Sequence, residues 1–128
     1  MNVKQFNQTI FIPNGDHEIP ARIEKPASAA AEKKVPAVVI LHGTGTQKDE
    51  VAGSYKRLAK MLARAGIASI RIDFLGHGES KGHEKDFNFS NARADIYKAS
   101  EYIGQFDWVD ENRIGLVGWS QGGLHAYL

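Results

Sequence analysis

The first quarter of the chain carries the pattern of a β-hairpin. Residues 6–12 are rich in β-branched and aromatic side chains, and residues 19–24 alternate apolar residues with proline or charged ones. The sequence Pro-Asn-Gly-Asp at 13–16 lies between them, and Asn-Gly is favoured in two-residue hairpin turns. Because proline cannot donate a hydrogen bond, Pro20 predicts that the second strand has a free edge there or begins later.

From residue 36 onward, apolar segments of strand length alternate with segments of helical period. Three segments are typical of buried parallel strands: residues 37–41, 67–72 and 113–117. Residues 54–65 repeat apolar side chains at helical spacing and are followed by Gly66, a typical C-cap residue. A second helix is predicted after an N-cap at Ser90. Its apolar stripe comprises Ala92, Ile96, Ala99, Ile103 and Phe106. A third helix is predicted over residues 121–128.

This alternation predicts an α/β fold in which a parallel sheet is built by right-handed crossovers. Residues 27–34, an Ala, Ser and Lys stretch, are interpreted as an exposed connector. They do not form a domain linker, because too little chain precedes them to make a domain.

The strongest chemical signal is Gly-Trp-Ser-Gln-Gly at residues 118–122, directly after a predicted strand and at the start of a helix. A serine on so sharp a turn needs glycine two positions before and after it, because a Cβ there would clash. The turn would hold Ser120 above the strand ends, where helix N–H groups favour a developing oxyanion. We predict that Ser120 is a catalytic nucleophile. The alternative is a glycine-rich turn with an incidental serine.

A second glycine-rich segment, His-Gly-Thr-Gly at residues 42–45, follows the strand at 37–41. Acyl transfer needs backbone N–H donors for the oxyanion. We assign these to the N–H groups of Thr44 and of Gln121, the residue after Ser120. The alternatives are a flexible loop or a phosphate-binding loop. A Walker phosphate-binding loop is excluded because no Gly-Lys-Ser/Thr follows. A dinucleotide-binding loop is disfavoured because this segment lacks the third glycine of that motif.

A third segment, Asp-Phe-Leu-Gly-His-Gly-Glu-Ser at 73–80, predicts a tight loop at the same edge of the sheet. His77 lies between its glycines and is interpreted as a structural hydrogen-bonding residue rather than a general base. The other histidines are assigned to the oxyanion loop (His42), to packing (His125) and to solvated turns (His17 and His83). Trp108 and Trp119 are interpreted as core or site-wall aromatics.

These three motifs, in this order and with this strand–helix rhythm, resemble the α/β-hydrolase superfamily. Ser-Gln-Gly-Gly at 120–123 is most similar to bacterial esterases of the cinnamoyl/feruloyl type and to serine-aminopeptidase-like hydrolases. The resemblance covers the chain from about residue 6. It implies the N-terminal portion of an α/β-hydrolase fold: a β-hairpin followed by a parallel βαβαβ unit with a nucleophile elbow.

In complete members of the superfamily, a catalytic Asp or Glu and then a His follow the nucleophile. Only eight residues follow Ser120. We therefore expect residues 1–128 to be an incomplete α/β-hydrolase domain, with the catalytic Asp and His supplied by chain not present here. The resemblance also places the strand at 114–117 at the edge of the sheet, open to pairing. The first partner expected is thus the missing C-terminal half, and homo-oligomers are the second.

Composition narrows the alternatives. With 16 Lys and Arg against 15 Asp and Glu, the chain has no charge excess that would favour nucleic acid or an anionic membrane. The absence of Cys excludes a thiolate nucleophile and Cys-ligated zinc. His and acidic residues do not have metal-ligand spacing, so we expect no metal and no cofactor. The N-terminus lacks an apolar signal segment, and a cytoplasmic location is expected.

The leading hypothesis is a serine hydrolase that cleaves small carboxylic esters through an acyl-enzyme. One alternative is a peptidase or thioesterase with the same machinery. Another is a catalytically inactive fragment that associates through its open sheet edge.

Overall fold

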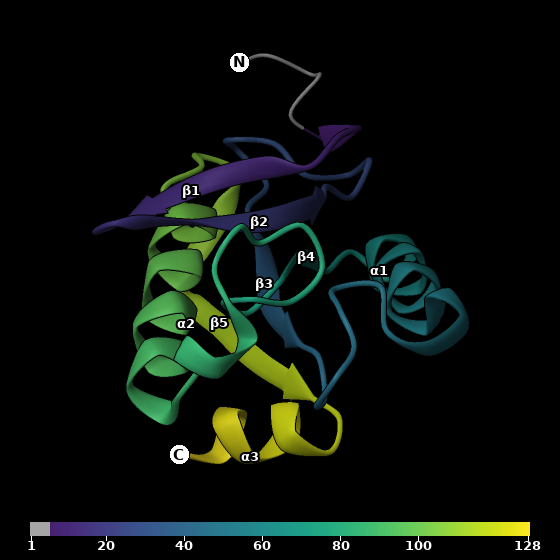
Figure 1. The fold of residues 1–128 in the computed structure, drawn as a ribbon. Helices are drawn as coiled ribbons and strands as arrows, with labels where there is room; N and C mark the ends of the chain where they lie inside the picture. The colour runs from purple at the N-terminus through teal and green to yellow at the C-terminus, as the bar shows by residue number, and fades with distance from the viewer. Residues whose placement is uncertain (1–5) are drawn as a thin grey trace.

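Five strands form one mixed β-sheet in the computed structural model, which describes residues 6–128 (Figure 1). Their order across the sheet is β1-β2-β4-β3-β5. The strands are β1 (Ile10–Asn14), β2 (His17–Glu24), β3 (Val35–Leu41), β4 (Ala68–Ile72) and β5 (Val109–Gly118). The helices are α1 (Ser54–Arg64), α2 (Phe89–Gly104) and α3 (Gln121–Tyr127), with 3-10 turns η2 (Val51–Gly53) and η3 (Glu84–Asp86). The predicted α/β class is confirmed.

The predicted hairpin is present, but its first strand begins at Ile10 rather than at residue 6. Phe6 lies outside the strand, and its ring packs 5.9 Å from those of Phe106 and Trp108. The turn residue Gly15 has φ 64°, which glycine adopts without strain.

Pro20 lies at a locally free edge of β2, as predicted, because it has no partner in β4. The ladder between β2 and β4 starts one residue later, at the pair of Ala21 and Ile72. The missing N–H of Pro20 therefore costs no pairing within β2–β4, and its carbonyl still accepts from the Asp73 N–H at 2.9 Å.

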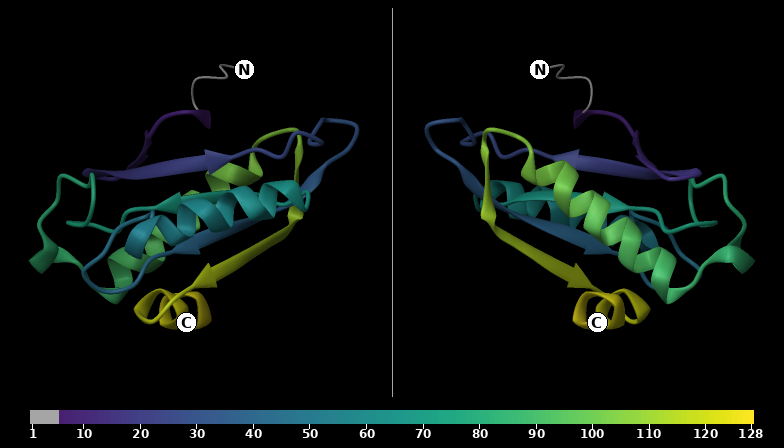
Figure 2. Two further views of the ribbon diagram at one scale, coloured as in Figure 1. Left: turned by 90° about the vertical axis from the view of Figure 1, so that its right-hand side faces the viewer. Right: turned by 90° about the vertical axis from the view of Figure 1, so that its left-hand side faces the viewer.

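The two crossover helices lie on opposite faces of the sheet (Figure 2). β3 pairs in parallel with β4 through the α1 crossover and with β5 on its other side. Gly66, at φ 82°, ends α1 as predicted, and its N–H bonds the Ala63 carbonyl at 3.0 Å. This topology brings the loops after β3, β4 and β5 to one end of the sheet.

The face under α2 carries the hydrophobic core. Side chains at alternate positions of the strands pack there against the predicted stripe of α2, whose Ala92, Ile96, Ala99 and Ile103 are all buried. The opposite face, under α1, is more polar. Arg71 is 2% exposed there and pairs with Asp49 at 2.8 Å.

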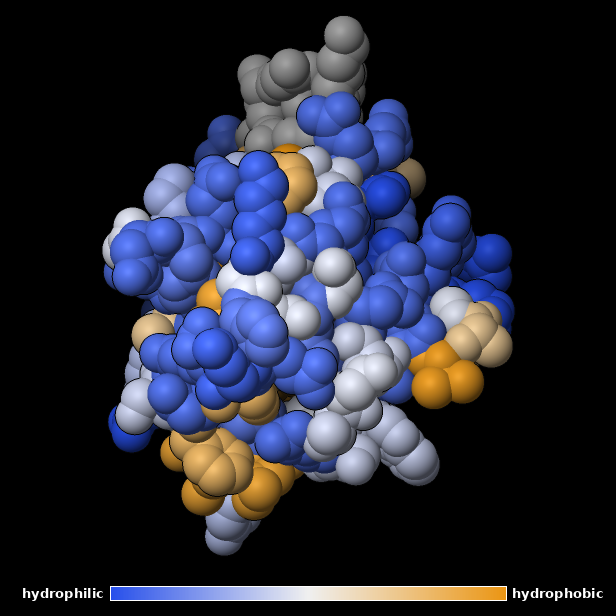
Figure 3. Space-filling view, in the orientation of Figure 1, coloured by the Kyte–Doolittle hydropathy of each residue, from blue (hydrophilic) through white to orange (hydrophobic). Residues whose placement is uncertain are grey.

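β5 forms one edge of the sheet, as the resemblance implied. Its Leu116 is 40% exposed, although it belongs to the strand on which the Ser120 elbow is built. Hydrophobic residues also gather on the surface where α2 begins and α3 ends (Figure 3), where Phe89, Leu124 and Leu128 are exposed.

The starts of α2 and β5 also differ from prediction. The N-cap of α2 is Asn88, not Ser90, because the Asn88 side chain accepts from the Asn91 N–H at 2.8 Å. β5 begins at Val109 rather than at residue 113. Among the helices of residues 6–128, none has both the length and the apolar character that a membrane span requires.

Candidate active site

The elbow at residues 118–122 has the geometry that its glycines predicted. Ser120 has φ 55° and ψ −121°, a left-handed conformation that costs a non-glycine residue about 1–3 kcal/mol. A Cβ on Gly118 would lie 2.2 Å from the Gly122 carbonyl, and one on Gly122 would lie 2.1 Å from the Leu41 carbonyl oxygen. Any other residue at either position would force the backbones apart, so the turn depends on both glycines.

The β3–α1 loop (residues 42–50) packs directly against this elbow. A Cβ on Gly43 would lie 3.2 Å from the Trp119 carbonyl oxygen and 3.4 Å from the Ser120 Cβ. The Thr44 hydroxyl donates a hydrogen bond to the Gln121 side-chain carbonyl. The structure thus places Thr44, Ser120 and Gln121 side by side. Gln121 is the first residue of α3, so its N–H has no acceptor within that helix.

His42 links the β3–α1 loop to the segment that follows β4. Its Nε2 accepts from the Phe74 N–H at 3.1 Å, and its Nδ1 lies 2.8 Å from the Gly43 carbonyl. This pattern requires the neutral tautomer with its proton on Nδ1. Burial lowers the pKa of His42 below its usual value, which favours the same neutral form. With both ring nitrogens engaged, His42 has a structural role in the loop.

A buried ion pair fixes the far end of the β3–α1 loop. Lys48 donates to Asp73 twice, through its N–H at 2.7 Å and its Nζ at 2.9 Å. The same Nζ reaches Glu79 at 2.6 Å, and the Glu79 N–H returns to Asp73 at 2.9 Å. Burial alone lowers the pKa of Lys48, but hydrogen bonds to Glu79 and Asp73 outweigh burial, so the pKa is raised. Gly78, at φ 54°, lies so close that a Cβ would be 2.4 Å from the Asp73 carboxyl carbon.

Two further side chains hold this region, and sequence reasoning missed both. Glu50 is 6% exposed and accepts the Gly43 N–H at 2.8 Å. The Tyr55 hydroxyl, at the start of α1, donates to the Leu41 carbonyl at 2.9 Å. Burial raises the pKa of Tyr55, and the Glu50 charge acts in the same direction. The only signal in the sequence is a Glu seven residues after Gly43, which by itself points to no contact.

His77 and His125 pack in an aromatic cluster beside the site. The His77 Nδ1 lies 2.9 Å from the Leu75 carbonyl, and its ring centroid is 5.2 Å from that of His42. This is the structural hydrogen bond expected for His77. His125 packs on Phe74 and Phe87 with centroids 5.1 and 5.5 Å apart, and burial lowers its pKa. The expectation that His125 is a packing or sheet-facing residue agrees with its 7% exposure.

The expectation of a solvated His17 is wrong. Its Nε2 lies 2.8 Å from a carboxylate oxygen of Asp95, a residue of α2 that is 1% exposed. Asn14 donates to the same oxygen at 2.8 Å. Burial raises the pKa of Asp95, although both hydrogen bonds act in the opposite direction. The hairpin tip is thereby bound to α2, a contact 78 residues apart that no local pattern could reveal. His83 is exposed, as expected.

The tryptophans have different environments. Trp108 is 1% exposed and stacks on Phe106 at 5.0 Å, as expected for a core aromatic. Trp119, between Gly118 and Ser120, is 68% exposed, and a Cβ on Gly43 would lie 3.6 Å from its ring. Among the described residues, no group of three or more His, Cys, Asp or Glu could hold a metal ion.

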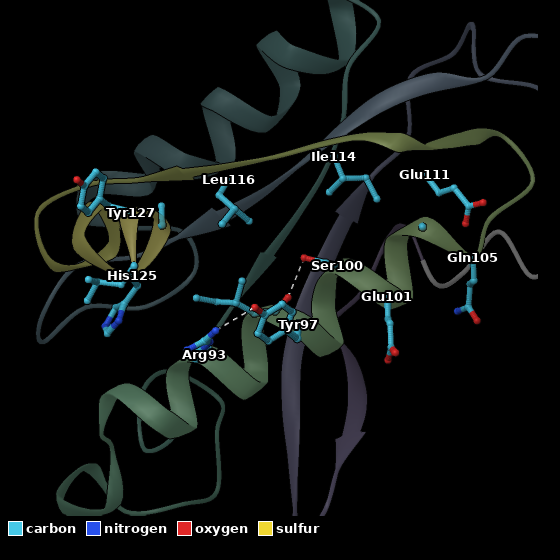
Figure 4. A pocket seen from close by; sticks show the side chains of 14 residues that line it. Arg93, Tyr97, Ser100, Glu101, Gln105, Glu111, Ile114, Leu116, His125 and Tyr127 are labelled. Carbon is cyan, nitrogen blue, oxygen red and sulfur yellow. Dashed lines mark hydrogen bonds between the residues drawn. The ribbon is translucent and has the colours of Figure 1, made fainter.

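A groove of about 720 Å³ runs along the β5 edge, between α2 and α3 (Figure 4). Tyr97 and Ser100 line it from α2, Ile114 and Leu116 from β5, and Tyr127 from α3. Ser120 and Thr44 are not among its lining residues. The groove is therefore a feature of the open edge and not a substrate cleft at the elbow.

Comparison with known proteins gives a consistent picture. The serine aminopeptidase family S33 matches residues 32–128. The uncharacterized protein YcjY of Escherichia coli K12 is 31% identical over 121 residues, which are 91% of this chain and 39% of that protein. Est1E of Butyrivibrio proteoclasticus, solved with ferulic acid, superimposes with a TM-score of 0.80 at 27% identity, over 91% of this chain and 44% of Est1E.

An esterase from Exiguobacterium antarcticum shares the fold, with a TM-score of 0.69 at 20% identity, over 91% of this chain and 37% of the esterase. The chain thus spans about two fifths of the length of these relatives.

Proposed function

Since the chain belongs to the serine aminopeptidase family S33 of the α/β-hydrolase superfamily, we propose that the protein containing it is a serine hydrolase of carboxylic esters. Ser120 is the nucleophile in this proposal. The observation that carries it is the left-handed Ser120 backbone, at φ 55°, with glycine two residues before and after it and the β3–α1 loop packed close to it at Gly43. A strained backbone of this kind persists only where its surroundings enforce it, and such sites are often functional.

The proposed reaction runs through an acyl-enzyme. The Ser120 hydroxyl oxygen attacks the carbonyl carbon of the ester while a histidine takes the hydroxyl proton. The N–H groups of Thr44 and Gln121 stabilise the oxyanion of the tetrahedral intermediate. The C–O bond to the alcohol breaks, and the alcohol leaves with the proton. Water then attacks the acyl-enzyme by the same route and releases the carboxylic acid and free Ser120.

We propose that residues 1–128 form the N-terminal part of a longer hydrolase domain, whose remainder supplies the catalytic His and its acidic partner. Three observations support this: the share of its relatives that the chain spans, the exposed Leu116 on β5, and the open groove beside it. The small-molecule acyl substrate, association into homo-oligomers and the cytoplasmic location stay predictions.

Substitution of the nucleophile tests the proposal. In the complete protein, Ser120→Ala is expected to abolish p-nitrophenyl butyrate hydrolysis, a loss of at least about 1,000-fold in kcat. Labelling by a fluorophosphonate probe should be lost with it. Ser90→Ala, an exposed serine on α2, is the matched control and should retain both. Residues 1–128 alone should show little or no turnover. Hydrolysis that survives Ser120→Ala would refute the assignment.

Amide hydrolysis is a second candidate function, favoured by the family match to serine aminopeptidases. The same nucleophile and N–H donors serve both reactions, since both pass through a tetrahedral oxyanion. Paired aminoacyl p-nitroanilides and p-nitrophenyl esters separate the two. A kcat/KM for the anilide at or above that for the ester would identify a peptidase.

A further inference from the structure

Glu50 lies at the base of the β3–α1 loop and plays no direct part in the reaction proposed above. Its carboxylate is buried, and one oxygen accepts the Gly43 N–H at 2.8 Å. The other oxygen lies 3.3 Å from the Val51 N–H. Its backbone has φ 61°, in the left-handed region that non-glycine residues rarely adopt. The loop therefore accepts an unfavourable conformation at Glu50 and directs the side chain back beneath Gly43.

Gly43 is held on both sides. Glu50 accepts its N–H, and its carbonyl lies 2.8 Å from the His42 Nδ1. Because a trans peptide is planar, the direction of the Gly43 carbonyl sets that of the Thr44 N–H, which points the opposite way. His42 thus holds the peptide that carries the Thr44 N–H, and Glu50 holds the peptide before it, so the two buried side chains restrain Gly43 from both ends.

The aim matters because Gly43 is also the contact between this loop and the nucleophile. A Cβ on Gly43 would lie 3.2 Å from the Trp119 carbonyl oxygen and 3.4 Å from the Ser120 Cβ, so the Gly43 backbone packs close to the elbow. The Gly43 N–H bond to a carboxylate is charge-assisted and stronger than a neutral one. A rotation of Gly43 would move the Thr44 N–H away from the developing oxyanion, and such donors act only within a narrow distance range.

We propose that Glu50 is a positioning residue, which holds Gly43 so that the Thr44 N–H points to the oxyanion formed at Ser120. The proposal rests on the proposed function. Glu50 acts here as a hydrogen-bond acceptor. It neither takes a proton from the substrate nor contributes its charge to the reaction.

Three substitutions in the complete protein separate an acceptor from a charge. Glu50→Gln keeps a carbonyl oxygen at the same reach without the charge, Glu50→Asp keeps the charge but shortens the reach, and Glu50→Ala removes both. The expected order of kcat on p-nitrophenyl butyrate is Glu, Gln, Asp, Ala, with Ala lower by about 10- to 100-fold and KM changed by less than about threefold. A kcat for Asp above that for Gln would overturn the acceptor role.

A comparison of ester with thionoester substrates reports on the oxyanion donors themselves, since sulfur is larger than oxygen and accepts hydrogen bonds more weakly. The preference for the ester, as a ratio of kcat/KM values, should fall in Glu50→Ala and persist in Glu50→Gln. Asp49→Ala is the matched control: Asp49 lies on the same loop but pairs with Arg71 at 2.8 Å. It should lower the melting temperature without changing the ratio. An unchanged ratio in Glu50→Ala would overturn the inference.

Failure of the proposed function has a different signature. It appears as a wild-type protein without Ser120-dependent hydrolysis, whereas failure of this inference appears as an active wild type with fully active Glu50 variants. An amide signal assigned to Gly43 by ¹⁵N-glycine labelling gives an activity-independent readout. The Gly43 amide proton signal should move upfield in Glu50→Ala. An unmoved signal would overturn the inference, whether or not the wild-type protein hydrolyses esters.

Discussion

The β3–α1 loop and the elbow at residues 118–122 meet at Ser120, but they are held in place by different means. In the loop, buried side chains carry the backbone: Glu50 accepts the Gly43 N–H, and Lys48 bonds Asp73. The elbow instead depends on residues without side chains, because Gly118 and Gly122 let backbone segments approach where no Cβ fits.

The difference extends to the surroundings. Lys48 and Asp73 are 5% and 1% exposed, so the ion pair that holds the loop is already covered by the described residues. The elbow is followed by a short helix with exposed Leu124 and preceded by a strand with exposed Leu116. The loop is thus stabilised from within residues 6–128, whereas we propose that the elbow also depends on chain that covers the β5 edge.

The comparison predicts the largest effect for Gly122→Ala. The added Cβ would lie 2.1 Å from the Leu41 oxygen and 2.7 Å from the His42 oxygen, both backbone atoms of a buried strand end. Because neither can rotate away, we expect a loss on the order of 4 kcal/mol in the free energy of unfolding and of more than about 100-fold in kcat. Urea titration and ester hydrolysis by the complete protein measure both.

Gly123→Ala is the matched control for that substitution. Its Cβ would meet the Gly118 oxygen at 3.2 Å, and alanine favours the helix by about 1 kcal/mol over glycine. Its free energy of unfolding should stay within about 1 kcal/mol of wild type. Equal losses in the two variants would show that the elbow does not depend on close backbone approach.

Lys48→Met tests the loop side of the comparison and ranks second. It leaves the Asp73 carboxylate buried with backbone donors only, and removal of one partner from a buried pair costs about 3 kcal/mol or more. Since Glu50 still holds Gly43, kcat should fall less than in Gly122→Ala, by under about tenfold.

Lys98→Met is the control for Lys48, because its pair with Glu101 is exposed and 3.6 Å long. Such surface pairs contribute about 0–1 kcal/mol. A Lys48 variant as stable as the Lys98 variant would mean that the ion pair does not organise the loop.

The elbow could be predicted from the sequence because its determinant is local. Glycine two residues on either side of Ser120 states the backbone geometry directly, and the flanking apolar segments supply the strand and the helix. The strands β3 and β4 were equally readable, since both are buried on two faces. The start of β5 was predicted four residues late, because residues 110–113 are polar and lie at a register shift of the β3–β5 ladder, between the pairs Val35–Val109 and Ala37–Ile114.

The side chains that hold the β3–α1 loop could not be predicted from the sequence, because their contacts are not local. Lys48 and Asp73 are 25 residues apart and meet only after β3 and β4 have paired. Glu50 reaches Gly43 through a left-handed backbone that a glutamate rarely adopts, so its local sequence argues against the conformation. His17 likewise looks like a turn residue until the crossover places Asp95 beside it.

The smallest expected effect concerns two histidines, one on each side of the comparison. Burial lowers the pKa of both His42 and His125 below the value in the unfolded chain. The unfolded state therefore binds these protons more readily, and stability is complete above the unfolded pKa of about 6.5 and falls as pH drops through the folded values.

His125→Phe removes one of the two contributions and suits its neighbours Phe74 and Phe87. Urea titrations from pH 8 to pH 4.5 should give a flatter acid limb for this variant but not a level one, since His42 still titrates. A limb that coincides with wild type would show that His125 does not couple protonation to folding.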